Sequence, residues 1–246
     1  RFRILGARPV TVSGNLKVDT LPPPFDEAEY EKLKQWIGDR QVWAAVSTHA
    51  GEEDIAADVH QSLKASHKAL TIIVPRHPER ADDVEEMLEA RGLVTARRSR
   101  GDVITAETQV YLGDTIGEMG LYLNLSQIAF VGRSLTSTGG QNPLEPAMCD
   151  CVILSGRNIQ NFRDSYRSLI KNGGARLVND GETLAKSVEF LMSNRRASDK
   201  MRAAARKTVE ELSGALPRTI MALEPYINPL TVKAELRHEP GRKPKW

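Results

Sequence analysis

The sequence predicts an α/β fold, a Rossmann-like doubly wound parallel sheet. From Val42 onward, apolar runs of strand length alternate with amphipathic stretches of helical period, which is typical of βαβ units. Two loop motifs, GDTIGEM at 113–119 and GGQNPLEP at 139–146, each stand between an apolar run and an amphipathic stretch. Turns at the carboxyl ends of parallel strands gather free backbone N–H groups and short polar side chains, which suit a phosphate and a ribose. We therefore expect the chemistry of this protein at these loops.

The amino-terminal region contains a short extended run, a connector and a helix. The β-like run Val10–Val12 is followed by Gly14-Asn15, a turn signal. Three consecutive prolines at 22–24 then stop regular structure and predict a stiff connector. A short helix is expected at Glu27–Trp36.

Seven apolar runs are strand candidates, enough for a sheet of six or so parallel strands with helices on both faces. In chain order they are Val42–Val46, Ala69–Val74, Val94–Ala96, Gln109–Leu112, Ile128–Val131, Cys151–Leu154 and Arg176–Val178. Apolar stripes at helical spacing mark the helices between them, such as Val84, Met87 and Leu88, which Gly92 closes.

Further helices are expected after the last strand. An apolar stripe marks one of them, and Ser198 is expected to cap the next. A last amphipathic stretch extends beyond Pro217 to Tyr226. Residues 228–246 form a basic tail with several prolines, which we expect to be poorly ordered.

Composition restricts the class of protein. Hydrophobic residues at 40% and charged residues at 27% are typical of soluble globular proteins. A formal net charge of +2 gives no overall field, so no nucleic-acid partner is expected. Cys149 and Cys151 are too close together to staple the fold and are expected to be reduced cytosolic thiols. No apolar run is long enough to cross a bilayer, and no signal peptide is evident.

No metal and no cofactor are expected. No Cys/His cluster has metal-ligand spacing, and no Asp-x-Asp pair is present to hold a diphosphate through magnesium. His60 and His67 lie on a predicted helix without partners and are expected at the surface. The segment 47–53 follows the first predicted strand and is placed to line the site. For His49 within it, an ordinary hydrogen-bonding loop residue is the alternative.

The run VPRHPER at 74–80 ends a buried strand with a displayed arginine. Pro75 and Pro78 delay the next helix, so Arg76 is left at the tip of the strand. A guanidinium is permanently charged and can donate two parallel hydrogen bonds to a phosphate. We predict that Arg76 contacts a phosphate; an incidental surface arginine is the alternative.

The GDTIGEM motif predicts a ligand-binding helix start. Thr115 is expected to cap a helix whose first turn contains Gly117 and Glu118, and glycine there lets a ligand approach the backbone N–H groups. In the alternative, an ordinary strand-to-helix turn, Asp114 and Thr115 only satisfy the donors of the helix itself.

The GGQNPLEP motif predicts a second site loop. Adjacent Gly139 and Gly140 permit a tight turn with positive φ, Asn142 is a cap candidate, Pro143 fits the first helical position, and Glu145 falls in the first turn. A carboxylate at that place can accept both hydroxyls of a ribose. The carboxylate can also interact favourably with the positive end of the helix dipole. Ribose binding and this interaction with the dipole do not exclude each other.

Clusters of basic residues are candidates for contact with an anionic membrane surface. They are Arg97, Arg98 and Arg100, then Arg195 and Arg196, and then Arg242, Lys243 and Lys245. The alternative is that these runs are simply solvated.

Six stretches together resemble one family, the 3-deoxy-D-manno-octulosonic acid (Kdo) transferases of lipopolysaccharide assembly. They are VSGNLKVD at 12–19, STHAGEE at 47–53, VPRHPER at 74–80, GDTIGEM at 113–119, FVGRSL at 130–135 and GGQNPLEPA at 139–147. The resemblance implies one half of a GT-B glycosyltransferase, the carboxyl-terminal half that binds the donor, CMP-Kdo. Residues 1–40 are then a connector from an amino-terminal domain and 41–227 the CMP-Kdo binding domain; a chain that begins at Arg1 agrees with a fragment.

The resemblance also implies which residues form the site. The CMP contacts carried over are Pro75, Arg76, Ile116, Gly117, Glu118, Asn142, Pro143, Leu144 and Glu145. Further residues expected to line the pocket are Ser47, Thr48, His77, Met119, Ser134, Gly139 and Gly140. Gln141 departs from the many members with histidine there, so its contacts are left open. No catalytic residue is expected in this chain, because the general base of the family is a glutamate of the amino-terminal half.

The implied reaction is inverting transfer of Kdo from CMP-Kdo to a lipid A precursor, without metal or cofactor. The full protein would work at the cytoplasmic face of the inner membrane and meet the membrane surface. This fragment is expected to be soluble and to bind CMP without transferring Kdo. Two alternatives stay open: a GT-B transferase or epimerase that uses a uridine diphosphate sugar, and a noncatalytic nucleotide-binding module.

Overall fold

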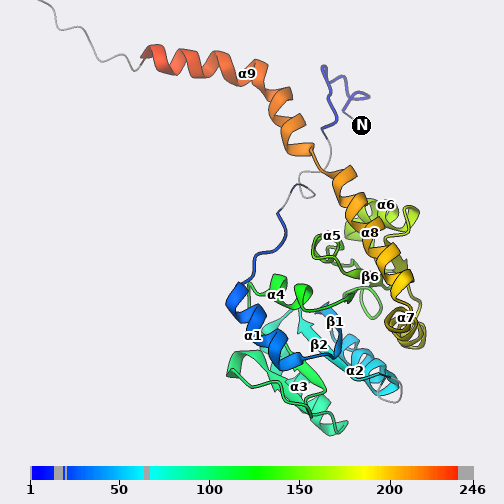
Figure 1. The fold of residues 1–246 in the computed structure, drawn as a ribbon. Helices are drawn as coiled ribbons and strands as arrows, with labels where there is room; N and C mark the ends of the chain where they lie inside the picture. Colours follow the sequence, from blue (N-terminus) through cyan, green and yellow to red (C-terminus); the bar gives the residue numbers. More distant parts are fainter. Residues whose placement is uncertain (1, 14–18, 20, 64–66, 238–246) are drawn as a thin grey trace, which may run out of the picture. The chain divides into compact units, whose positions relative to one another are not determined.

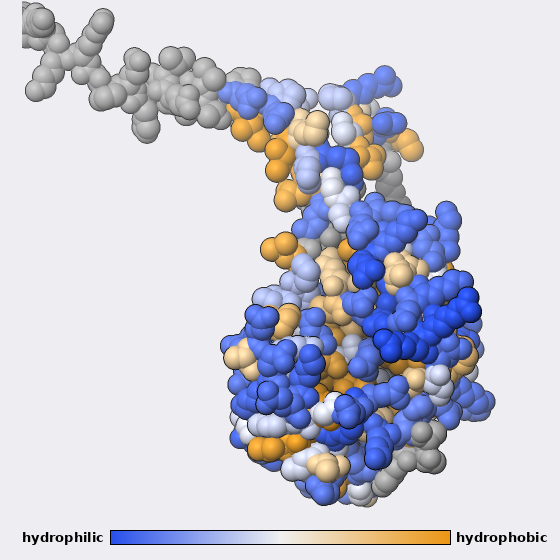
Figure 2. Space-filling view, in the orientation of Figure 1, coloured by the Kyte–Doolittle hydropathy of each residue, from blue (hydrophilic) through white to orange (hydrophobic). Residues whose placement is uncertain are grey.

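The computed structural model describes residues 2–13, 19, 21–63 and 67–237 (Figure 1). The chain forms two compact units, Leu21–Glu210 on the one hand and Arg1–Thr20 with Glu211–Trp246 on the other. The limits at 40 and 227 that the sequence predicts do not coincide with this division and stay a prediction. Hydrophilic side chains cover most of the face shown in Figure 2.

The larger unit is built around a parallel sheet of seven strands. The strands are β1 (Gln41–Thr48), β2 (Ala69–Pro75), β3 (Thr95–Arg97), β4 (Val110–Leu112), β5 (Ile128–Val131), β6 (Val152–Ser155) and β7 (Ala175–Leu177). All seven strand candidates are confirmed. Their order is β3-β4-β2-β1-β5-β6-β7. From β1, the chain first adds strands on one side of the sheet (β2, β3 and β4) and then on the other (β5, β6 and β7), so a topological switch point lies between β1 and β5. That topological switch point is where sheets of this class bind ligands, outside the carboxyl ends of the strands.

Helices cover both faces of the sheet. They are α1 (Glu27–Ile37), α2 (Glu52–Leu63), α3 (Ala81–Ala90), α4 (Met119–Asn124), α5 (Leu144–Met148), α6 (Arg163–Lys171), α7 (Gly181–Ser193) and α8 (Arg195–Leu212). The last helix, α9 (Ala215–Arg237), belongs to the smaller unit. Strand β1 shows why two cores form: Trp43 and Ala45 pack with α2, α3 and α7, whereas Ala44 and Val46 pack with α1 and α4. Both faces are therefore buried, as a parallel sheet requires.

Local signals explain most helix limits. The Asp26 carboxylate accepts hydrogen bonds from the N–H groups of Ala28 and Glu29, at 2.8 and 3.1 Å, and so begins α1. Gly38, with φ of 63°, ends it. The run Val10–Val12 forms no strand: as far as the structure describes the chain, it joins no sheet.

Two expectations about the carboxyl-terminal helices differ from the structure. The cap of α8 is Asn194, whose side-chain oxygen accepts from the N–H of Ala197, whereas Ser198 lies inside the helix and donates to the carbonyl of Leu191. The prediction of Ser198 as the cap is therefore wrong. Helix α9 continues to Arg237, past both Tyr226 and the predicted start of the tail; residues 238–246 lie outside the described part.

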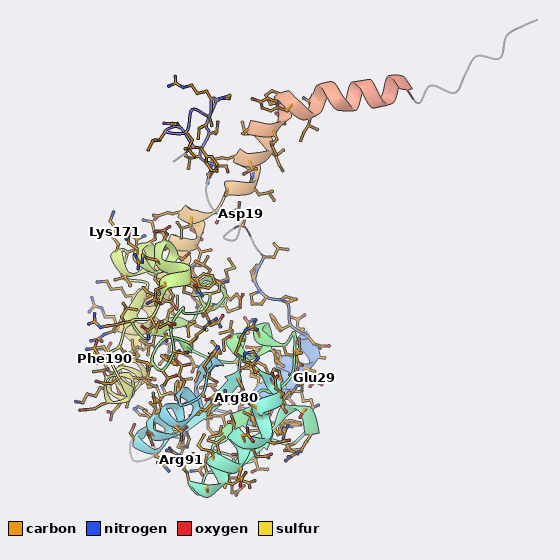
Figure 3. All side chains as sticks on the ribbon, turned by 180° about the vertical axis from the view of Figure 1, so that it is seen from behind. Asp19, Glu29, Arg80, Arg91, Lys171 and Phe190 are labelled. Carbon is orange, nitrogen blue, oxygen red and sulfur yellow. The ribbon has the colours of Figure 1, made fainter. Side chains whose placement is uncertain are left out.

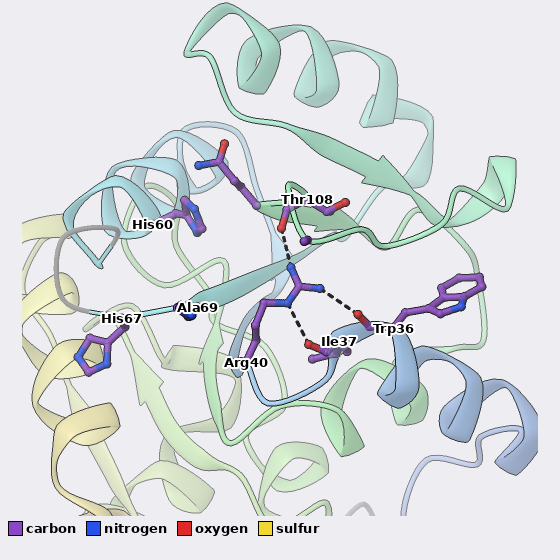
Figure 4. Close-up of a pocket in the computed structure, with 10 residues that line it drawn as sticks. Trp36, Ile37, Arg40, His60, His67, Ala69 and Thr108 are labelled. Atoms are coloured by element: carbon purple, nitrogen blue, oxygen red, sulfur yellow. Dashed lines mark hydrogen bonds between the residues drawn. The ribbon is translucent and has the colours of Figure 1, made fainter.

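A cavity of about 530 Å³ opens at the amino ends of β1 and β2, opposite the carboxyl edge (Figure 4). Arg40 lines it and donates to the carbonyls of Ile37 and Thr108, at 3.0 and 2.8 Å, which joins the end of α1 to the segment before β4. His60 also lines it and is only 3% exposed, with its Nδ1 2.8 Å from the Thr71 hydroxyl. The prediction of His60 at the surface is wrong, because it lies on the inner face of α2. His67 is half-buried and lies beyond that helix.

The smaller unit ties the amino-terminal segment to α9. The Asp19 carboxylate accepts from the N–H groups of Gly214, at 2.6 Å, and Leu216, and so caps the helix. Arg218 donates to the carbonyl of Ser13 at 2.8 Å. Most of the VSGNLKVD stretch, residues 14–18, lies outside the described residues. Among the helices as described, none is both long and apolar enough to cross a membrane.

Candidate functional site

The loops that carry the predicted site residues leave the sheet at one edge. Arg76 follows β2, the 113–118 loop follows β4, and the 132–143 loop follows β5. These strands and β1 are consecutive in the sheet, in the order β4-β2-β1-β5, and all are parallel. Hydrogen bonds join the strand ends, from Arg76 N–H to the Thr48 carbonyl at 3.0 Å and from Gly132 N–H to the Val46 carbonyl at 2.8 Å. The three segments therefore share the carboxyl edge, on both sides of the switch point.

Arg76 presents its side chain to solvent. Within the part of the chain that the structure describes, its guanidinium has no hydrogen bond or ion pair. His77 beside it is also exposed, with its Nδ1 3.3 Å from the Glu79 carboxylate, and its ring centroid is 5.8 Å from that of His49 in the loop after β1. All N–H donors of the Arg76 guanidinium are thus available to an anionic ligand.

The 113–118 loop differs from its prediction at the helix start. Helix α4 begins at Met119, and Gly117, with φ of 87°, lies in the turn before it. Thr115 caps nothing: its hydroxyl bonds to the Glu118 carboxylate and, at 2.6 Å, to the Tyr122 hydroxyl. The predictions of Thr115 as the cap and of Gly117 in the first helical turn are wrong, because the left-handed glycine interrupts the helix.

The apex of this loop is open. The Ile116 side chain is 88% exposed, which is unusual for isoleucine in a folded chain. The Glu118 carboxylate is paired within the protein and accepts two hydrogen bonds from Arg98, at 2.6 and 3.0 Å. Met119 is half-buried against the core under α1 and α4. An apolar side chain and bare backbone are therefore what this loop offers a ligand.

The 139–145 loop has the geometry that its motif predicts, shifted by one residue. Gly139 and Gly140 have φ of 121° and 74°. Helix α5 begins at Leu144, whose N–H donates to the Asn142 side-chain oxygen at 3.1 Å, so Pro143 stands just before the first helical residue. Asn142 also donates to one oxygen of Glu145 at 3.1 Å. The other oxygen of Glu145 has no partner among the described residues and is free to accept.

Two residues expected to line the pocket turn their hydroxyls inward. Thr48 donates to the Glu53 carboxylate at 2.8 Å. Ser134, 1% exposed, donates to the carbonyl of Val131 at 2.6 Å and accepts from the N–H of Gly156 at 2.8 Å. Both hydroxyls are therefore committed to holding the loops. Ser47, half-buried, has φ of 54°, a strained conformation of a kind that gathers at functional sites.

Sequence reasoning missed Glu52, the residue that organises the centre of this edge. Its side chain is fully buried. One carboxylate oxygen accepts from the N–H groups of His49 and Arg133, at 3.0 and 2.7 Å, and the other from those of Ser134 and Leu135, at 2.8 and 3.0 Å. The only sequence signal was its place in the first turn of a helix that follows a strand.

The Glu52 carboxylate has a consequence for ligand binding. Three successive N–H groups, those of residues 133–135, would make an anion-binding nest at the tip of β5. Glu52 fills that nest from inside the protein. A phosphate at this edge therefore cannot use these three N–H groups. The guanidinium of Arg76, which has no partner among the described residues, is a cation that it could use.

Glu53 and Arg80 form a second buried support, which sequence reasoning also missed. Glu53 is 1% exposed and receives two hydrogen bonds from Arg80, at 2.7 and 3.2 Å (Arg80 is labelled in Figure 3). The bond to Glu53 raises the pKa of Arg80 despite its partial burial. This pair joins the start of α2 to the turn after β2, close to Arg76.

The arginines at 97–100 are paired and do not form a bare basic patch. Arg97 bonds Asp114 at 2.5 Å, Arg98 bonds Glu118, and Arg100 bonds Glu85 at 2.7 Å. This removes the main support for the hypothesis of a membrane-binding cluster here. Arg242 and its neighbours lie outside the described residues. Across 2–13, 19, 21–63 and 67–237, no three His, Cys, Asp or Glu side chains gather as a metal site requires.

Comparison with known proteins places the chain in a family, although no protein-family model matches it. A 3-deoxy-D-manno-octulosonic acid transferase of Haemophilus influenzae is 34% identical over 232 residues, which are 92% of this chain and 54% of that protein. The crystal structure of the carboxyl-terminal CMP-Kdo binding domain of WaaA from Acinetobacter baumannii is 34% identical, with a TM-score of 0.70, over 74% of this chain and 96% of that domain.

A more distant structure shows the fold alone. A UDP-N-acetylglucosamine 2-epimerase from Listeria monocytogenes superposes with a TM-score of 0.60 at 17% identity, over 99% of this chain and 58% of that one. The predicted fold class, a Rossmann-like half of a GT-B glycosyltransferase, is confirmed. The chain spans about half the length of the curated relatives it matches. At 34% identity both to a transferase of this name and to a CMP-Kdo binding domain that it covers to 96%, the chain belongs to the 3-deoxy-D-manno-octulosonic acid transferase family.

Proposed function

We propose that this chain is the donor-binding half of a glycosyltransferase that moves Kdo from CMP-Kdo to a lipid A precursor in lipopolysaccharide biosynthesis. The observation that carries the proposal is the 34% identity to a CMP-Kdo binding domain over 96% of that domain. The three loops predicted to contact CMP lie at the edge of the sheet where such a ligand binds.

Each loop has a proposed role in holding the donor. Pro75 and Arg76 hold the single phosphate, since Arg76 is an unpaired guanidinium at the tip of β2. The exposed Ile116 and the backbone of Gly117 and Glu118 lie against the nucleoside. Asn142, Pro143, Leu144 and Glu145 hold the ribose, whose hydroxyls donate to the free oxygen of Glu145.

The chemistry of transfer needs a group that this half does not supply. When CMP leaves from one face of the Kdo ring, a general base must take the proton of the acceptor hydroxyl on the other face. We assign that base, and the acceptor site, to the half of the relatives that this chain does not span. The full enzyme would work at the cytoplasmic face of the inner membrane, where its lipid acceptor lies.

Calorimetric titration with CMP, UDP and cytidine tests the proposal. We expect CMP to bind at least about ten-fold more tightly than cytidine, because a charge-assisted contact to phosphate contributes about 1.5 to 3 kcal/mol. We also expect CMP to bind more tightly than UDP and to raise the melting temperature of the chain.

Tighter binding of UDP would favour a transferase or epimerase of uridine diphosphate sugars. If no nucleotide bound, a noncatalytic module would be favoured. With CMP-Kdo and lipid acceptor, the isolated chain should show no turnover.

A further inference from the structure

Arg98 lies at the centre of a chain of hydrogen bonds beneath the 113–118 loop. Its Nε and Nη2 donate to the two oxygens of Glu118, at 3.0 and 2.6 Å, and its Nη1 donates to Glu29 of α1 at 2.6 Å. Glu118 also accepts from Thr115, whose hydroxyl bonds Tyr122. Glu29 is labelled on α1 in Figure 3. One guanidinium thus joins the loop to a helix far from it in sequence.

The Glu118 carboxylate is committed to this arrangement. Its hydrogen bond from Arg98 is the largest cause that lowers its pKa, with the bond from Thr115 in support, against the opposing effect of burial. Because both oxygens already accept bonds from Arg98, the side chain has little to offer a ligand. Glu118 is left to contact a nucleotide through its backbone.

A second pair holds the other end of the same loop. Asp114 accepts from the Nε of Arg97 at 2.5 Å, and from the N–H and hydroxyl of Ser99 at 2.9 and 2.6 Å. The turn at 97–100 therefore supports the loop at both of its ends. The apex has no comparable support from the described residues, since Ile116 is 88% exposed and Gly117 is exposed as well. The shape of the apex depends on the two ionic supports below it.

We propose that Arg98 is a positioning residue for nucleotide binding: it holds the backbone of residues 116–118 in the conformation that accepts CMP and ties that loop to α1. This inference rests on the proposed function, because it assigns the support of the same site. It makes Arg98 necessary for affinity although Arg98 itself touches no ligand. It also predicts that Arg98 and Glu118 act as one unit.

A double-mutant cycle on the chain tests this unit, with CMP titrated calorimetrically into wild type, Arg98→Met, Glu118→Gln and the double variant. We expect Arg98→Met to weaken binding about five- to ten-fold and the double variant to bind as Arg98→Met does, because both changes remove the same contact. Arg98→Lys keeps a positive charge beside the Glu118 carboxylate and should therefore recover part of the lost CMP affinity. If the effects of the two single changes multiply in the double variant, Glu118 touches the ligand directly and the inference is overturned.

Arg91 supplies the matched control. It also bridges two carboxylates, those of Asp54 and Asp58 at 2.7 and 2.5 Å, but on α2. Arg91→Met should leave CMP affinity within about two-fold of wild type, because the carboxylates that Arg91 bridges lie on α2 and hold none of the three loops of the proposed site. An equal loss of affinity in Arg91→Met would show that any broken ion pair weakens binding, and would overturn the specific role of Arg98.

Hydrogen exchange without ligand separates this inference from the proposed function. Peptides that cover residues 113–118 should exchange faster in Arg98→Met than in wild type, and at the wild-type rate in Arg91→Met. Unchanged exchange would overturn the positioning role even if CMP binds. If the wild-type chain does not bind CMP, the proposed function is overturned. Faster exchange of residues 113–118 in Arg98→Met would in that case still show that Arg98 holds this loop. If Arg98→Met does not fold, Glu118→Gln and Thr115→Val test the same loop.

Discussion

Replacing Glu52 by alanine is expected to lower the free energy of unfolding by about 3 to 5 kcal/mol. The side chain is fully buried, and its carboxylate accepts four backbone hydrogen bonds from the loops after β1 and β5. Alanine leaves those donors without a partner where water has little access. Glu52→Gln should lower the free energy of unfolding by less than alanine does, because the amide oxygen still accepts hydrogen bonds from two of the four N–H groups. Some stability is still lost, because the NH₂ group cannot accept from the other two.

Urea unfolding followed by circular dichroism measures this loss as a lower midpoint with an unchanged slope. Glu182→Ala is the matched control, since Glu182 also lies in the first turn of a helix, α7, but is 75% exposed in its pair with Lys186. It should change stability by less than about 0.5 kcal/mol. A loss of under about 1 kcal/mol in Glu52→Ala would contradict the account of Glu52 as the support of both loops.

Arg76→Met is expected to weaken CMP binding about 10- to 100-fold, the largest loss of affinity among the single changes considered. The Arg76 guanidinium is exposed and unpaired within the described residues, so its removal leaves no buried partner and the fold should keep its stability. The CMP affinity of Arg76→Lys should lie between those of wild type and Arg76→Met, because lysine keeps the charge but not the two parallel donors.

Cytidine is the control ligand for Arg76, because it shares every contact except those to phosphate. Its affinity, measured by the same titration, should differ by less than about two-fold between wild type and Arg76→Met. Equal losses for CMP and cytidine would place Arg76 against the nucleoside or show a general disturbance of the site. Unchanged CMP affinity would remove Arg76 from the site altogether.

Regular elements and turn chemistry were predictable from the sequence because their signals are local. All seven strands were found as buried apolar runs, and Gly139 and Gly140 have the positive φ that adjacent glycines suggest. Glu145 lies in the first turn of α5, as the spacing from Asn142 indicates. These features depend on a few neighbouring residues, so the pattern of the sequence is enough.

Partners distant in sequence were not predictable. Glu52 meets residues 133–135, and Arg98 joins Glu29 to Glu118, across separations that no local pattern encodes. His60 was expected at the surface because polarity was the only signal, yet it bonds Thr71 inside the protein. Thr115 has a better partner than the helix donors, since Glu118 and Tyr122 lie within its reach. Tertiary contacts decided the cases of Glu52, Arg98 and His60, whereas the partners of Thr115 are local, three and seven residues further along the chain.

The central claim is that Arg76, the loop at 116–118 and Glu145 hold one CMP molecule between them. A crystal structure of the chain with CMP tests it most directly. The account predicts the phosphate within hydrogen-bond distance of the Arg76 guanidinium, the ribose hydroxyls on Glu145, and Glu118 still paired with Arg98. CMP bound away from the carboxyl edge of the sheet, or with its phosphate remote from Arg76, would contradict the claim.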